Sequence, residues 1–136
     1  MYLSGLSLVG IPRAIRITEE YPTEPFLTYQ ASKRFWQILR RMVSSGSAME
    51  WLMLRLTAFV GPATPGNRIF SVYVNHALSG KPLKLRGRCT DRKNHIDVRG
   101  VTSANERSLR RPISALLNLS GTHSLFVIRS KTRYSL

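Results

Sequence analysis

The sequence predicts an α/β fold with a parallel sheet, and three observations support this prediction. Strand-like and helix-like segments alternate along the chain. The mainly apolar run MEWLMLRLTAFV at 49–60 is typical of a strand buried on both faces, as in parallel sheets. Glycine and proline separate the segments, as in GPATPGN at 61–67. The 136 residues, of which 43% are apolar, are enough for one modest domain.

The order of the elements follows from their apolar patterns and from the residues that end them. The loop at 11–25 has three prolines and cannot be one helix. SSGS at 44–47 ends the helix that follows, and Gly80 ends the next one. The expected strands and extended pieces lie at 1–10, 49–60, 82–87, 95–98 and 115–121. The expected helices lie at 26–43, 67–79 and 101–111, and the tail from 122 is compatible with one more.

The charge balance is the unusual feature of the composition. The chain has 21 Lys and Arg residues against 7 Asp and Glu residues, a net charge of +14. Such an excess attracts polyanions, whether nucleic acid, acidic membranes or phosphorylated small molecules. The basic residues are densest between Arg86 and Arg111 without forming one block. Nucleic-acid binding is the weaker interpretation, because no RNA- or DNA-binding module is recognisable and aromatic residues are not interleaved with the basic runs.

The cysteine, the histidines and the apolar stretches bear on metal binding and on the cellular compartment. Cys89 is the single cysteine, so it can form neither an internal disulfide nor a metal site by itself. His76 and His123 have no cysteine or histidine at ligand spacing, and we expect no metal site. No stretch approaches the roughly 18 apolar residues of a membrane span, and residues 1–10 lack the pattern of a signal peptide. We therefore expect a cytoplasmic protein without a membrane partner.

The segment TYQASKRF at 28–35 places Tyr29 and Lys33 four positions apart. On a helix, residues at this spacing lie on one face. An ammonium close to a phenol favours the phenolate form, so the pair is able to exchange a proton with a substrate hydroxyl. Tyr-x-x-x-Lys alone is a weak motif, so the flanking sequence is needed to interpret it.

The neighbouring motifs stand in a recognisable order. A strand (YLSGLSLVG), an acidic, proline-bearing loop (TEEYPTEP), the segment FLTYQASK and a strand (LRLTAFVGP) follow one another. This order resembles the extended short-chain dehydrogenase/reductase family, which includes the NAD-dependent sugar-nucleotide epimerases and dehydratases. The matching residues are Ser4, Gly10, Glu19, Pro22, Pro25, Tyr29, Ser32, Lys33, Leu54, Arg55, Gly61 and Pro62. The likeness continues in HALSGKPLKLRG, RKNHIDVRGV and LLNLSG, so it covers nearly the whole chain.

The resemblance implies a partial Rossmann-like fold and a catalytic site. Tyr29 would be the acid/base residue and Lys33 its partner. In this family the lysine also binds the nicotinamide ribose, so Lys33 and Tyr29 are the residues expected to meet the cofactor, NAD or NADP. The position of the family's catalytic serine or threonine falls on Gly5. Ser7 lies on the same face of the expected strand and is kept as its substitute.

The substrate side of the implied site is basic. The family's phosphate-binding arginine falls on Lys93, and lysine keeps the charge but loses the bidentate geometry. Arg92 beside it and Arg86 are the further candidates for binding the substrate diphosphate. The other departures are valines for two tyrosines, alanine for an asparagine, and arginine and glycine for two aspartates, at Val9, Val60, Ala58, Arg99 and Gly100.

The chain has no G-x-x-G-x-x-G loop between a first strand and a helix. By the resemblance, the half of the family fold that carries this loop precedes Met1, and the chain is an internal-to-C-terminal piece. Residues 1–62 would be the second half of the Rossmann-like domain, and 63–136 part of the substrate-binding region. We expect exposed strand edges, covered by the missing N-terminal half or in a homodimer.

The implied function is that of an NAD(P)-dependent epimerase, dehydratase or reductase acting on a nucleotide-sugar or a related substrate by hydride transfer. Tyr29 would take and return the proton. A non-catalytic binding remnant of the same family is the second interpretation. A small basic nucleic-acid-binding protein is the third, which the charge of +14 allows.

Overall fold

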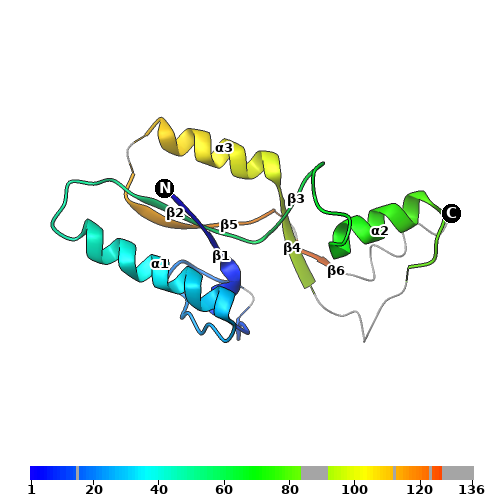
Figure 1. Ribbon diagram of the computed structural model, residues 1–136, viewed down its shortest axis with the longest axis horizontal. Helices are drawn as coiled ribbons and strands as arrows, with labels where there is room; N and C mark the ends of the chain where they lie inside the picture. The colour runs from blue at the N-terminus through cyan, green and yellow to red at the C-terminus, as the bar shows by residue number, and fades with distance from the viewer. Residues whose placement is uncertain (15, 84–91, 112, 123, 127–136) are drawn as a thin grey trace.

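The fold contains two small sheets that follow one another along the molecule (Figure 1). The computed structural model describes residues 1–14, 16–83, 92–111, 113–122 and 124–126. The first sheet is parallel, in the order β1 (Tyr2–Gly5), β2 (Leu52–Leu56) and β5 (Ala115–Leu119). The second has the order β3 (Ala58–Val60), β4 (Arg92–Asp97) and β6 (Ser124–Phe126), with β3 and β4 parallel and β6 antiparallel to β4. The predicted α/β fold with a parallel sheet is confirmed.

Three helices complete the described fold. Helices α1 (Thr28–Ser44) and α3 (Val98–Leu109) lie on opposite faces of the first sheet, and α2 (Ile69–Leu78) lies beside the second (Figure 1). The three expected helices are therefore confirmed. Helix α3 begins earlier than expected because the Asp97 carboxylate accepts a hydrogen bond from the backbone N–H of Arg99 at 2.8 Å and caps the helix. Among the described residues, no helix has the length and hydrophobicity that a membrane crossing requires.

The apolar core surrounds β2. Its residues Leu52, Met53 and Leu54 are buried, together with Leu8 and Val9 from the 3-10 turn η1 (Leu6–Val9). β2 is the central strand of the first sheet and is covered on both faces, which explains why its residues are apolar without alternation.

The prediction of a single strand over 49–60 is wrong. The chain passes from the first sheet to the second at Thr57, whose backbone N–H donates to the Leu119 carbonyl while its hydroxyl donates to Asn94 Oδ1 at 3.3 Å. β3 is not buried as expected, since Phe59 is 61% exposed. The tail prediction is also wrong for 124–126, which form β6 by pairing with β4. Residues 84–87 of the expected piece at 82–87 lie outside the described residues.

The division of the chain at residue 62 stays a prediction. β5, from the second of the two expected segments, pairs with β2 from the first. The two segments therefore share one sheet.

A buried arginine joins the elements of the first sheet to the loop before α1. Arg55 is only 2% exposed, and its guanidinium donates to the Glu19 carbonyl at 2.9 Å and to Gln37 Oε1 at 3.0 Å. Gln37 Nε2 donates in turn to the Ser4 hydroxyl at 2.9 Å. The Glu19 carboxylate accepts the backbone N–H of Asn118 at 2.7 Å. The loop, α1, β1, β2 and β5 are thus connected by one set of hydrogen bonds.

We expect Arg55→Ala to lower the free energy of unfolding by about 2–4 kcal/mol, because it leaves the Glu19 carbonyl and the Gln37 amide without their donor in the protein interior. Arg110→Ala is the matched control. Arg110 is exposed and pairs with Glu106 across one helical turn, so its loss should cost about 0.5 kcal/mol or less. Urea unfolding measures both, and equal effects would contradict the structural role given to Arg55.

Candidate active site

Tyr29 and Lys33 lie together on the first turns of α1. The Lys33 ammonium is 5.6 Å from the centroid of the Tyr29 ring and 5.0 Å from that of Tyr2. It donates a hydrogen bond to the Leu3 carbonyl at 3.1 Å. Tyr29 is 59% exposed, so its ring is accessible to a ligand. The helical juxtaposition expected from the spacing is present, while the catalytic roles of the two residues stay predictions.

The end of β1 brings a second hydroxyl toward Tyr29. A Cβ atom built on Gly5 would lie 3.4 Å from the Ser7 hydroxyl and 3.8 Å from the Tyr29 hydroxyl. Both hydroxyls therefore flank the position where the family pattern has a serine or threonine. Gly5 has an extended backbone, with φ −118° and ψ 140°, that any residue adopts. The geometry is compatible with Ser7 as the substitute, and that role also stays a prediction.

The position of Tyr29 depends on how α1 packs against β1. Gln37, two turns after Tyr29 on the same helix face, is buried and donates to the Ser4 hydroxyl. Lys33, one turn after Tyr29, contacts the Leu3 carbonyl. These two bonds fix the helix along and around its axis relative to β1. The expected site residues do not include Gln37, although its spacing of four from Lys33 is a signal for this shared helix face.

The start of α1 is fixed by another glutamine. Gln30 Oε1 accepts the backbone N–H groups of Phe26 and Leu27 at 2.9 and 3.1 Å. Donors at a helix N-terminus have no partner within the helix, and this side chain supplies one. Tyr29 therefore belongs to an ordered first turn.

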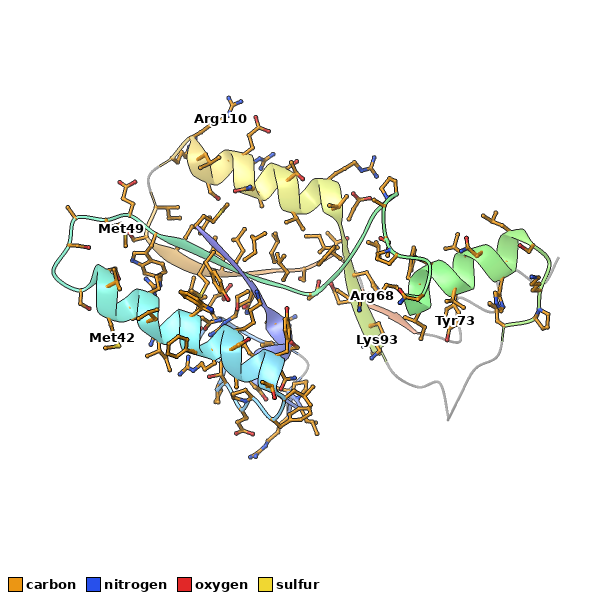
Figure 2. The ribbon with its side chains drawn as sticks, viewed as in Figure 1. Met42, Met49, Arg68, Tyr73, Lys93 and Arg110 are labelled. Atoms are coloured by element: carbon orange, nitrogen blue, oxygen red, sulfur yellow. The ribbon has the colours of Figure 1, made fainter. Side chains whose placement is uncertain are left out.

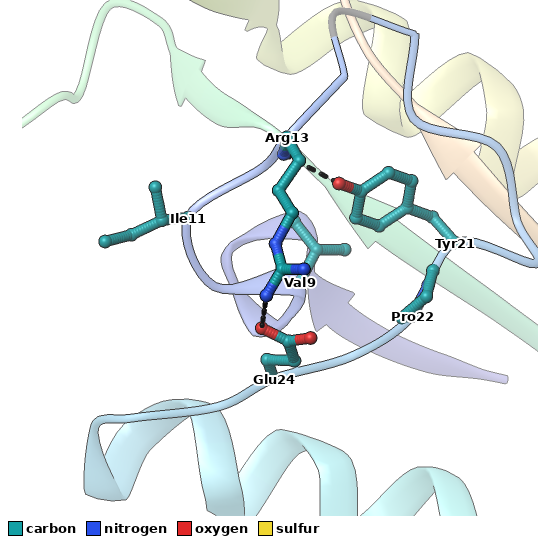
Figure 3. Close-up of a pocket in the computed structure, with 6 residues that line it drawn as sticks. All are labelled: Val9, Ile11, Arg13, Tyr21, Pro22 and Glu24. Carbon is teal, nitrogen blue, oxygen red and sulfur yellow. Dashed lines mark hydrogen bonds and ion pairs between the residues drawn. The ribbon is translucent and has the colours of Figure 1, made fainter.

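The loop between η1 and α1 encloses a small cavity next to β1 (Figure 3). The backbone N–H of Arg13 donates to the Tyr21 hydroxyl at 2.7 Å, and the Arg13 guanidinium lies 3.8 Å from the Glu24 carboxylate. Gly10 has φ +72°, and a Cβ there would come within 2.5 Å of the Glu24 carbonyl, so glycine is required. The cavity measures about 80 Å³, which is below the ~300 Å³ at which ligand pockets begin.

The residues expected to bind the substrate lie on the second sheet. Lys93 and Arg92 are in β4, and Lys93 lies near α2 and its Tyr73, away from α1 (Figure 2). Arg86 falls outside the described residues. Within the described part of the chain, no hydrogen bond or ion pair connects Lys93 with Tyr29 or Lys33.

His95 is the titratable group next to Lys93. It faces the Phe70 ring at 5.8 Å between centroids. Burial lowers the pKa of His95 below 6.5, and the Lys93 charge lowers it further. Four residues after His95, Arg99 stands where the family has an aspartate, and its side chain donates two hydrogen bonds to the Asp97 carboxylate, both at 2.9 Å. In the described ranges, no group of three histidine, cysteine or acidic residues is placed to hold a metal ion.

The solved structures most useful for comparison are nucleotide-sugar enzymes. A dTDP-glucose 4,6-dehydratase from Bacillus anthracis, solved with NAD, is 21% identical, with a TM-score of 0.84 over 97% of this chain and 43% of its own. A UDP-N-acetylglucosamine 4-epimerase from Methanobrevibacter ruminantium, in complex with UDP-N-acetylmuramic acid, is 17% identical, with a TM-score of 0.86 over 94% of this chain and 43% of its own. The dTDP-glucose 4,6-dehydratase DesIV from Streptomyces venezuelae is 18% identical, with a TM-score of 0.82 over 98% of this chain and 42% of its own.

These likenesses confirm the Rossmann-like fold, and the chain spans less than half the length of these enzymes. No curated protein sequence is significantly similar to the chain. The family model described as "NAD dependent epimerase/dehydratase family" matches residues 1–118, which is most of the chain. With β1 ending at Gly5 and α1 presenting Tyr29 and Lys33 beside it, the chain therefore belongs to the NAD-dependent epimerase/dehydratase family.

Proposed function

We propose that this chain supplies the acid/base site of an enzyme that acts on a nucleotide-sugar by NAD-dependent hydride transfer, as an epimerase, dehydratase or reductase. The observation that carries the proposal is the convergence of the Tyr29 hydroxyl, the Lys33 ammonium and the Ser7 hydroxyl at the C-terminal end of β1. Ligands of open α/β sheets bind at this end of the strands.

Each of the three side chains has a distinct task. Tyr29 accepts the proton from a substrate hydroxyl and returns it. Lys33 stabilises the phenolate by its charge, and Ser7 donates a hydrogen bond to the substrate oxygen as that oxygen gains or loses negative charge. Bound NAD, or NADP, supplies the acceptor and donor of the hydride.

The residues present fit one end of such a cofactor. An ammonium has three N–H donors, and Lys33 gives one to the Leu3 carbonyl, so two are available to ribose hydroxyls. The pyrophosphate end has no counterpart in the sequence, which lacks a G-x-x-G-x-x-G loop. That loop would have to come from the part of the enzyme that this chain does not span.

The names of similar structures support the substrate class. One was solved with NAD and another with UDP-N-acetylmuramic acid. The family membership supports the same chemistry. Nucleic-acid binding gains no support from these comparisons. A non-catalytic remnant of the family is the remaining alternative, and the first experiment separates it from the enzyme.

The first prediction concerns Tyr29 in a chimera in which this chain replaces the matching segment of the Bacillus anthracis dehydratase. We expect NAD to raise the melting temperature of the chimera and dTDP-glucose to be converted. Tyr29→Phe should lower kcat by about 100-fold or more, because the proton acceptor is lost, and should leave the NAD-dependent melting shift unchanged. Tyr73→Phe on α2 is the matched control and should have no effect. Unchanged turnover in Tyr29→Phe would contradict the role, and NAD binding without turnover would favour the remnant.

The second prediction tests Ser7 through Gly5 in the same chimera. Ser7→Ala should lower kcat by about 100-fold, the typical cost of removing one hydrogen-bond donor from a developing charge. Gly5→Ser would place a new hydroxyl near Tyr29, since the Cβ position lies 3.8 Å from the Tyr29 hydroxyl. The double variant should therefore recover much of the turnover lost in Ser7→Ala. Full activity of Ser7→Ala would exclude Ser7 from the site.

The third prediction tests Lys93 as a phosphate-binding residue, with His95 as the reporter and UDP as the probe. Lys93→Met should raise the pKa of His95, because the neighbouring positive charge is removed, and UDP bound at Lys93 should raise it in the unaltered chain. An NMR titration of the His95 ring measures both, and Lys81→Met is the control.

The lowered pKa of His95 also makes the stability of the fold depend on pH. Because the folded state lowers the pKa of His95, its neutral ring stabilises the fold above pH 6.5, and this contribution is lost as the pH falls through the lowered value. Lys93→Met should reduce that loss in thermal melts. UDP binding that leaves His95 unaffected would place the phosphate site elsewhere.

A further inference from the structure

Lys33 has a second aromatic neighbour, Tyr2, which has no task in the proposed function. The Lys33 ammonium lies 5.0 Å from the centroid of the Tyr2 ring and 5.6 Å from that of the Tyr29 ring. An ammonium within about 6 Å of a ring centroid is attracted by the negative face of the ring. The ammonium therefore interacts with two rings, and the nearer of them belongs to Tyr2.

The side chain of Tyr2 faces α1 because of its place in β1. Successive side chains of a strand point to opposite faces of the sheet. The Ser4 hydroxyl accepts a hydrogen bond from Gln37 of α1, so the Ser4 side chain faces that helix. Tyr2 lies two residues before Ser4 and shares this face. The alternation of β1 thus brings the Tyr2 ring to the helix that carries Lys33.

The Tyr2 ring is itself held by aromatic packing. Trp36 lies 6.2 Å from it between centroids, and Phe35 meets Trp36 edge-on at 6.0 Å. Tilted and edge-on pairs at these separations are favourable. Tyr2 is half-buried, and its hydroxyl has no hydrogen-bond partner among the described residues. The contact with the ammonium is consequently made by a ring of fixed position and not by the hydroxyl.

A lysine ammonium needs more than one contact to stay in one place, because it is a point charge on a flexible four-carbon stem. The hydrogen bond to the Leu3 carbonyl, at 3.1 Å, uses one of its three N–H donors. Lys33 is only half-buried, so water competes for the charge. The Tyr2 ring adds a second contact from β1, and the two contacts together keep the ammonium beside the Tyr29 ring.

We propose that Tyr2 is a positioning residue of the active site, whose ring holds the Lys33 ammonium beside Tyr29. The inference rests on the proposed function for the task of Lys33, which is to stabilise the Tyr29 phenolate. No ring contact joins Tyr2 with Tyr29 in the described part of the chain, so Tyr2 acts on the phenol through the ammonium. Without the Tyr2 ring, the ammonium spends more time in solvent and the phenolate is less stabilised.

NMR of the unaltered chain tests the contact. The ε-protons of Lys33 should resonate upfield of those of Lys81, because they lie over an aromatic ring, and should show NOEs to the Tyr29 ring. Tyr2→Leu should reduce the upfield shift. It should also weaken these NOEs about twofold or more, the change in population expected from losing one cation–π contact. Tyr2→Phe keeps a ring and should retain both signals.

Phe35→Leu is the matched control. It removes a ring of the same aromatic cluster that makes no described contact with Lys33, so both signals should persist. Lys33 ε-protons that resonate with those of Lys81 in the unaltered chain would overturn the proposal, and this measurement does not depend on a variant that folds. Unchanged NOEs in Tyr2→Leu would overturn it too.

The chimera with the Bacillus anthracis dehydratase tests the consequence for the reaction. Tyr2→Leu should lower kcat at neutral pH about two- to fivefold and leave the KM for dTDP-glucose unchanged. It should also move the acid limb of the kcat profile to higher pH, because a less stabilised phenolate forms at higher pH. Tyr2→Phe should restore the profile. An equal loss at every pH would indicate a merely structural role and would overturn the proposal. If the chimera is inactive while the NMR contacts are present, the proposed function fails and the hold of Tyr2 on the ammonium stands.

Discussion

The fold depends on one buried guanidinium, that of Arg55, whose two terminal nitrogens donate hydrogen bonds while its Nε is buried without a partner among the described residues. Arg55 is in the central strand of the parallel sheet, where a charged group is expensive unless its donors are used. Its acceptors come from the loop, through the Glu19 carbonyl, and from α1, through Gln37. Burial lowers the pKa of Arg55, and the charges of Arg34 and Arg41 lower it further, yet an arginine stays protonated in proteins. The elements around it must therefore adopt positions that supply acceptors, and this requirement sets their arrangement.

The geometry of the proposed active site follows from that requirement. Gln37, Lys33 and Tyr29 are spaced by four and share one face of α1. Gln37 is held in the buried network by Ser4 and Arg55, so the helix cannot slide along β1 without breaking bonds in the protein interior. Along this face, Gln37 is buried, Lys33 contacts the Leu3 carbonyl and Tyr29 is exposed. The buried contacts of Gln37 therefore help to fix the position of Tyr29.

The sequence predicted what depends on local spacing and missed what depends on distant contacts. The pairing of Tyr29 with Lys33 and the three helices followed from periodicity, because residues four apart meet wherever a helix forms. The apolar run 49–60 contains no local signal that it changes sheets, since the change occurs where Thr57 meets Asn94, which is 37 residues away in sequence. The hydrogen bond from Lys33 to the Leu3 carbonyl could not be predicted from the sequence either. It depends on which side of β1 lacks a neighbouring strand among the described strands, and that is a property of the assembled sheet.

The passage between the two sheets separates the residues that the proposed function assigns to the substrate. Tyr29 lies beside the first sheet and Lys93 is on the second, so a ligand bound by both must cross the junction between them. The side-chain amide of Asn94 holds this junction together. Its oxygen accepts from the Thr57 hydroxyl and, at 2.8 Å, from the Gly121 N–H. Its nitrogen donates to the Gly121 carbonyl at 2.9 Å. A Cβ at Gly121 would overlap the backbone of His95, so the close approach depends on glycine. Under the proposed function, a nucleotide-sugar bound by both Tyr29 and Lys93 would extend across this junction, and the hydrogen bonds of Asn94 hold the two sheets together there.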